Sequence, residues 1–134
     1  MLHYDGPSRR IDDVETIFFV RDIKQEDILE ALRQGRTYVR FNLGSKPLVL
    51  REFSVKNLNS DSVQINIKGN NSSSGPIKIE LISNGKIFKS FQEAKEEWVI
   101  VVEDNLSAKN EKRYYRLKIS SSSSLILSNP VFAE

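Results

Sequence analysis

Apolar and polar residues follow two different periods along this chain. Between residues 24 and 34 the apolar positions recur every three to four residues, which is the spacing of one face of an α-helix. From residue 37 onwards they mostly recur at every second residue, which is the spacing of a β-strand with one buried face. The two patterns meet at Gly35. They predict one short helix followed by a series of strands.

The predicted helix carries a single apolar stripe, whose members are Ile28, Leu29, Ala31 and Leu32. Asp22 and Gln25 have the spacing of a capping box at its start, and Gly35 is typical of the left-handed residue that ends a helix. A helix of roughly three turns is not stable alone. We therefore expect the stripe to dock on another surface.

The strand pattern predicts a mainly β fold, an antiparallel β-sandwich of seven to eight strands with one short N-terminal α-helix. A short buried strand is expected at residues 16–20, and further strands at 37–42, 47–56, 63–68, 77–81, 87–91, 98–103, 113–120 and 125–132. Asn84 and Gly85 favour a type I′ hairpin turn. Residues 1–15 are predicted to form a polar tail or linker, and residues 16–134 a single domain.

Composition narrows the class of protein. The chain has 134 residues, 39% hydrophobic and 28% charged, which is typical of one soluble globular domain. A net charge of +2 without a basic block argues against nucleic-acid binding. No apolar run approaches the length of a membrane span, and no signal peptide is visible. The absence of cysteine fits a cytoplasmic protein without fixing the location.

Three stretches of the sequence are recognisable. They are residues 28–39 (ILEALRQGRTYV), residues 79–87 (IELISNGKI), and residues 114–117 (YYRL) with 128–132 (SNPVF). In this order and spacing they resemble the C-terminal β-sandwich of bacterial metal-dependent hydrolases of the PHP (polymerase and histidinol phosphatase) type. In that family two or three divalent metals lie in a separate (β/α) barrel marked by His-x-His and Asp-x-His motifs. This chain has neither motif, and its one histidine is His3.

The resemblance therefore implies a non-catalytic accessory domain that docks on a catalytic barrel of the same parent chain or on another protein partner. Divalent metals are expected only in such a catalytic domain, and no cofactor is expected in this chain. Fold analogy alone is a weak basis for a function. The alternative is a free-standing β-sandwich module that binds a carbohydrate or another surface ligand. A third hypothesis is an oligomeric enzyme that pools Asp and Glu ligands across subunits.

Arg36 and Tyr38 are the candidate partner-binding residues, because they follow Gly35, the predicted end of the helix, within the recognisable stretch at residues 28–39. Arg36 would pair with an acidic group on the partner. In the purely structural interpretation Tyr38 packs in the core and Arg36 lies at the negative end of the helix dipole.

Other candidate sites have an ordinary interpretation that we favour. His3 with Asp5, Asp12 and Asp13 lacks the converging ligands of a metal site and reads as a solvated tail, so no metal or catalytic residue is predicted. An aromatic platform for sugars would draw on Trp98, Tyr114 and Tyr115, but core packing is favoured for them. Adjacent Tyr114 and Tyr115 point to opposite faces of a strand and cannot share one platform.

Overall fold

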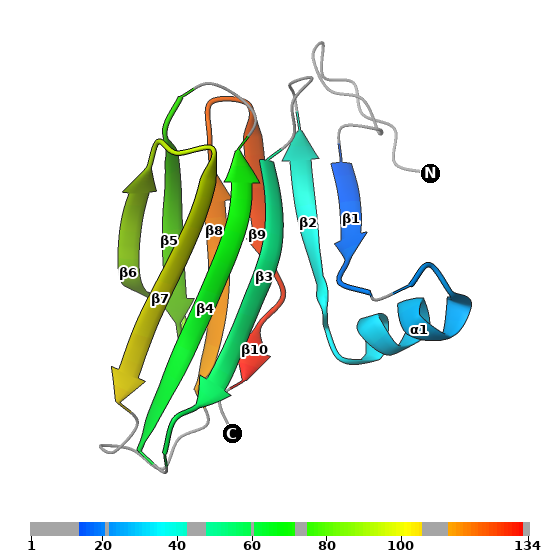
Figure 1. Ribbon diagram of the computed structural model, residues 1–134, viewed down its shortest axis with the longest axis horizontal. Coiled ribbons are helices and arrows are strands. Elements are labelled where there is room, and N and C mark those ends of the chain that lie inside the picture. Colours follow the sequence, from blue (N-terminus) through cyan, green and yellow to red (C-terminus); the bar gives the residue numbers. More distant parts are fainter. Residues whose placement is uncertain are drawn as a thin grey trace.

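The structure is a computed structural model that describes residues 14–20, 22–42, 48–59, 61–71, 75–105 and 113–132. Its elements in chain order are β1 (Val14–Phe18), α1 (Gln25–Arg33), β2 (Thr37–Asn42), β3 (Leu48–Asn57), β4 (Ser62–Asn71), β5 (Ile77–Ser83), β6 (Lys86–Glu93), β7 (Glu97–Asn105), β8 (Tyr114–Ser120), β9 (Ser124–Ser128) and β10 (Val131–Phe132). The predicted mainly β fold with one helix is confirmed (Figure 1).

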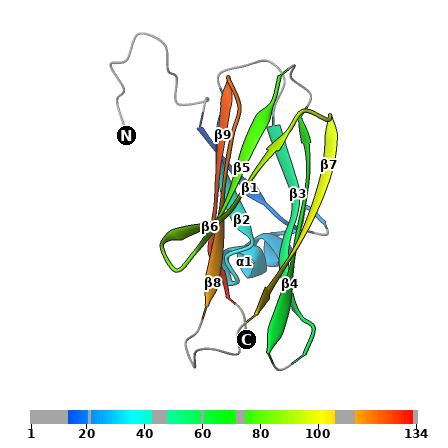
Figure 2. The same cartoon turned by 90° about the vertical axis from the view of Figure 1, so that its left-hand side faces the viewer.

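All strand pairs are antiparallel and form two sheets. The larger sheet has the order β1-β2-β9-β8-β5-β6, with β10 also paired to β8, and the smaller has the order β3-β4-β7. Seen edge-on, the sheets form two layers (Figure 2). The smaller sheet does not extend across β1 and β2, so the sandwich is open on that side. In both views α1 lies beside this opening, at a depth between the layers (Figures 1 and 2).

Strand alternation places the core between the sheets. In β4 the side chains of Val63, Ile65 and Ile67 are buried while those between them are partly exposed. β7 alternates in the same way, with exposed Val99 and Val101 on its outer face. The large side chains of the core that are almost completely buried include Leu48, Leu50, Ile79, Leu81, Tyr115, Leu117, Ile119 and Ile126. Burial of these apolar surfaces is the main source of stability.

Gly69 lies directly opposite Trp98 in the ladder between β4 and β7. A Cβ atom on Gly69 would lie 2.2 Å from Cζ2 of the Trp98 indole and 2.6 Å from the carbonyl oxygen of Val49. The indole therefore lies over the bare backbone of Gly69, a close approach of the kind that strand glycines permit.

Turns and helix ends were predicted with mixed success. Asn84 and Gly85 have φ angles of 50° and 82° and join β5 to β6, which confirms the type I′ turn. Gly35 has a φ of 67°, as expected after a helix. The capping box is wrong, because the N-cap residue is Lys24 and no side chain caps the helix. Asp22 instead approaches Lys24 at 4.0 Å.

The two ends of the described chain also differ from the prediction. β1 begins at Val14, so Val14 and Glu15 belong to the sheet and not to a polar tail. The expected final strand is divided into β9 and β10, because Pro130 has no N–H for a ladder and ends the pairing. The described residues form ten strands, where the pattern predicted a sandwich of about seven to eight. No helix in this part of the chain is long and apolar enough to cross a bilayer.

Candidate docking groove

A groove with a volume of about 860 Å³ opens beside β3. Its walls are residues 32–37, from the end of α1 to the start of β2, residues 51–55 of β3, and residues 128–132, from the end of β9 through β10. Phe19 also lines it. We call this feature the α1–β3 groove. It lies at the open side of the sandwich, where α1 stands apart from the smaller sheet (Figure 1).

The helical wall is only partly packed. Of the residues in α1 only Ala31 is buried, whereas Leu29 is 42% exposed and Leu32 is 53% exposed. Backbone hydrogen bonds fix the turn that follows the helix: Arg36 N–H donates to the Ala31 carbonyl at 2.8 Å, and Phe19 N–H donates to the Arg36 carbonyl at 2.9 Å. The expected docking of the stripe is thus incomplete within the described structure.

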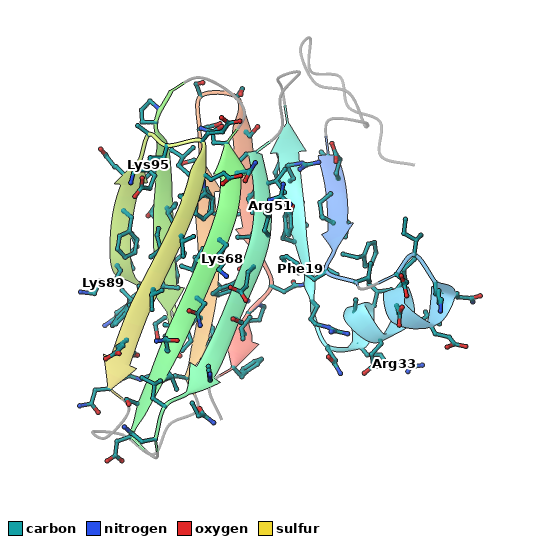
Figure 3. The ribbon with its side chains drawn as sticks, in the orientation of Figure 1. Phe19, Arg33, Arg51, Lys68, Lys89 and Lys95 are labelled. Atoms are coloured by element: carbon teal, nitrogen blue, oxygen red, sulfur yellow. The ribbon has the colours of Figure 1, made fainter. Side chains whose placement is uncertain are left out.

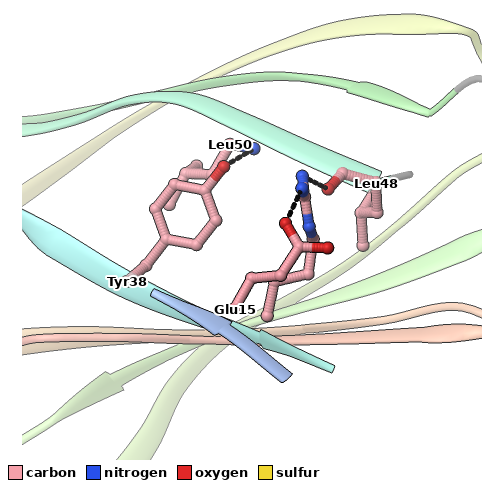
Figure 4. Close-up of polar contacts among 5 residues, drawn as sticks. Glu15, Tyr38, Leu48 and Leu50 are labelled. Carbon is pink, nitrogen blue, oxygen red and sulfur yellow. Dashed lines mark hydrogen bonds and ion pairs between the residues drawn. The ribbon is translucent and has the colours of Figure 1, made fainter. Parts of the chain in front are cut away.

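The N-terminal half of β3 is held by two side chains of β2. The backbone N–H of Leu50 donates to the Tyr38 hydroxyl at 3.3 Å, and Arg40 Nη1 donates to the Leu48 carbonyl at 3.1 Å (Figure 4). Arg40 Nη2 also pairs with a Glu15 carboxylate oxygen at 2.6 Å. These contacts bridge the two sheets at the edge where β1 and β2 overhang.

Of the two predicted partner-binding residues, only Arg36 has an accessible side chain. Tyr38 is 1% exposed, its ring lies 5.4 Å from that of Phe19, and burial raises its pKa. This position matches the packing interpretation of Tyr38. Arg36 is exposed on the wall of the groove. Its binding to a partner remains a prediction.

Positive charge dominates the rim of the groove. Arg33 pairs with Glu30 at 3.4 Å, and Glu52 pairs with Lys68 at 3.6 Å, so their charges are largely compensated. Arg36 and Arg51 have no carboxylate partner among the described residues; Arg51 donates only to the Asn70 amide oxygen at 3.3 Å. Figure 3 shows Arg51 on β3 and Arg33 on α1, on the two sides of the opening.

A buried polar cluster elsewhere has a structural role. Asp104 at the end of β7 accepts hydrogen bonds from the Tyr115 hydroxyl at 2.6 Å and from Arg113 Nη1 at 2.7 Å. Burial and the neighbouring Asp104 raise the pKa of Tyr115. These bonds tie β7 of the smaller sheet to β8 of the larger one. Both bonds go to Oδ2 of Asp104, which gives this carboxylate a role in joining the sheets.

The aromatic candidates separate as the alternation predicts. Trp98 and Tyr115 are buried in the core, while Tyr114 is partly exposed. Tyr114 instead approaches Phe132, with ring centroids 6.1 Å apart and planes tilted by 58°. Phe132 is 56% exposed and was not among the predicted candidates, because a strand pattern alone does not show which aromatic faces solvent.

No group of three or more His, Cys, Asp and Glu side chains suited to a metal occurs in the described ranges. His3, Asp5, Asp12 and Asp13 lie outside those ranges. Comparisons with protein-family models, curated proteins and solved structures gave no match. The resemblance to PHP-type hydrolases accordingly remains a prediction from three short stretches of sequence.

Proposed function

We propose that this β-sandwich is a non-catalytic accessory domain that docks on a protein partner through the α1–β3 groove. A catalytic domain of a PHP-type metal-dependent hydrolase, within the same parent chain, is the partner that the sequence resemblance favours. The observation that carries the proposal is the half-exposed Leu32 of α1, which lines one groove together with two arginines that lack carboxylate partners among the described residues.

Burying exposed apolar surface is favourable and would stabilise a complex at this groove. Fully burying a leucine side chain contributes about 1.5–3 kcal/mol, so covering the exposed half of Leu32, the stripe residue that lines the groove, would add on the order of 1 kcal/mol. Arg36 and Arg51 would supply electrostatic complementarity to an acidic patch, which governs association rate and specificity more than affinity. The groove thus offers an apolar centre with a charged rim, the usual layout of an interface.

The alternative of a carbohydrate-binding module is supported by the partly exposed pair of Tyr114 and Phe132. Sugar rings stack best on flat aromatic faces that share one plane. A tilt of 58° between the two rings does not provide such a plane, so we rank this function second.

A photo-crosslinking experiment tests the docking proposal. Benzoylphenylalanine would replace Leu32 or Arg36 in the native full-length protein, in the cells that make it. The control position is Ile87 on β6, which is 62% exposed at the opposite edge of the larger sheet. Crosslinks from positions 32 and 36 to one defined protein or to another part of the parent chain are expected. Equal crosslinking from position 87, or none from positions 32 and 36, would contradict docking at the groove.

A further inference from the structure

We infer that the α1–β3 groove binds an extended peptide strand that pairs with the free edge of β3 at Phe53 and Val55, and that this peptide combines apolar and acidic side chains. The inference rests on the proposed docking function and specifies its chemistry. It would make the partner segment a fourth strand of the β3-β4-β7 sheet, a mode of recognition that uses backbone hydrogen bonds for affinity.

Among the described strands β3 pairs with β4 alone, so it lies at the edge of its sheet. In an antiparallel ladder, successive residues direct their backbone groups alternately toward the neighbouring strand and away from it. Two hydrogen bonds fix this alternation at the two ends of β3. The backbone N–H of Leu50 points away from β4, since it donates to the Tyr38 hydroxyl on β2. The backbone N–H of Leu58, just after β3, points toward β4, since it donates to the Ser62 carbonyl at 3.0 Å.

Counting back from Leu58, the backbone groups of Val55 and Phe53 point away from β4 and toward the groove. The register agrees, because the irregularity between Leu50 and Glu52 inserts Arg51 as one additional residue and shifts the alternation by one position. In the described part of the chain, the outward backbone N–H and C=O groups of Phe53 and Val55 have no hydrogen-bond partner.

The two halves of β3 therefore differ as docking sites. At Leu48 and Leu50 the side chains of Arg40 and Tyr38 already bind the outward backbone groups, which closes that half of the edge to another strand. Beyond the bulge the edge lines the open groove. Exposed strand edges are usually blocked because they pair readily with other chains, so an edge blocked along only half its length marks the open half as a docking position.

The lining selects the type of strand. Phe53 and Val55 are partly buried against the core and, with Leu32 across the groove, offer an apolar surface to side chains on one face of a docked strand. Arg36 and Arg51 lie at the rim without carboxylate partners in the described structure, so acidic side chains on the other face would be favoured. Alternation of apolar and acidic residues satisfies both requirements.

The probe is a fluorescein-labelled peptide in which valine and glutamate alternate over seven residues, with binding to the full chain followed by fluorescence polarisation. Two further peptides keep every side chain but carry N-methyl groups, one on all valines and the other on all glutamates. Backbone N–H groups of alternate residues point to opposite edges of a strand, so each modification blocks a single edge. We expect one of these peptides to lose binding by at least about tenfold while the other binds within about twofold of the parent. Loss of binding by both or by neither would overturn strand pairing.

A second arm changes the protein. Val55→Pro removes one outward N–H, which edge strands tolerate because no internal ladder bond is lost. We expect it to weaken the peptide by at least about tenfold. Val101→Pro at the outward edge of β7 is the matched control and is expected to leave binding within about twofold. If Val55→Pro does not fold, the N-methylated pair decides alone. A lysine-for-glutamate peptide that binds as well as the parent would overturn the acidic preference.

The experiment separates this inference from the docking function. Crosslinks from Leu32 and Arg36 without edge-specific peptide binding would retain docking and overturn the strand pairing. Edge-specific peptide binding without such crosslinks would retain the strand pairing and refute docking at this groove in cells. Dimerisation of the protein that Val55→Pro abolishes would identify a second copy as the occupant and overturn the assignment to a partner peptide.

Discussion

The contact between Gly69 and Trp98 gives the sharpest test of the core. Gly69→Ala would place a methyl group 2.2 Å from the indole and 2.6 Å from the Val49 carbonyl oxygen, so neither a rigid ring nor a backbone atom can yield cheaply. Overpacking of this kind costs about 1–3 kcal/mol. The usual gain of about 0.5–1 kcal/mol for alanine over glycine in a strand offsets part of it. Since both contacts are severe, we expect a net loss of about 2 kcal/mol.

Urea unfolding followed by circular dichroism measures this loss, and a drop in Tm of roughly 8 °C should accompany it for a domain of this size. Trp98→Leu provides the matched background, because it removes the indole but keeps the Val49 oxygen. In that background we expect Gly69→Ala to cost about 1 kcal/mol, which gives a coupling energy of about 1 kcal/mol between the two positions. A loss below about 0.5 kcal/mol, or the same loss in both backgrounds, would refute the steric reasoning.

Three further predictions concern the polar cluster, alkaline pH and the helix. Asp104→Ala leaves the buried Tyr115 hydroxyl without its acceptor, and we expect urea unfolding to reveal a loss of about 2–3 kcal/mol; a loss below about 1 kcal/mol would contradict this. Burial raises the pKa of Tyr38 and of Tyr115, so the folded state keeps protons that the unfolded chain releases above about pH 10. These two tyrosines should therefore leave the free energy of unfolding unchanged below that pH. Above it, each should lower the free energy of unfolding by up to about 1.4 kcal/mol per pH unit. Tyr115→Phe should make this fall less steep. Leu32→Glu should change stability by less than about 0.5 kcal/mol because the side chain is half exposed, whereas Ala31→Leu should cost about 1–3 kcal/mol by overpacking, both measured by thermal unfolding.

Local sequence pattern accounts for most of the fold. The alternation in β4 and β7 and the Asn84-Gly85 turn are short-range signals, and the structure follows them. The break before β10 has a local signal, because Ser128, Asn129 and Pro130 interrupt the apolar residues on either side, but the prediction from the pattern is one continuous strand. Gly69 is also a local signal, since glycine within a strand indicates a close approach, although its neighbour Trp98 is known only once β4 and β7 are paired.

The groove could not be predicted in the same way, because it depends on strand order. Nothing near Arg40 in the sequence indicates that its guanidinium is buried against Glu15, which lies 25 residues earlier. Tyr38 has the same limitation, since its accessibility depends on β3 covering it. Whether an edge is free or blocked follows from which strands are neighbours, and a single sequence contains no direct record of that.

The overhang of β1, α1 and β2 divides the molecule into regions of unequal local stability. α1 is anchored by one buried alanine and by backbone bonds at its end, whereas β4 and β5 are buried within their sheets. Segments with few buried contacts open at a free-energy cost well below that of global unfolding. The amides of α1 should therefore exchange with solvent long before those of β4. A ligand seated against Leu32 would bury more of α1, so a filled groove would slow the exchange of the helix amides while leaving those of β4 unchanged.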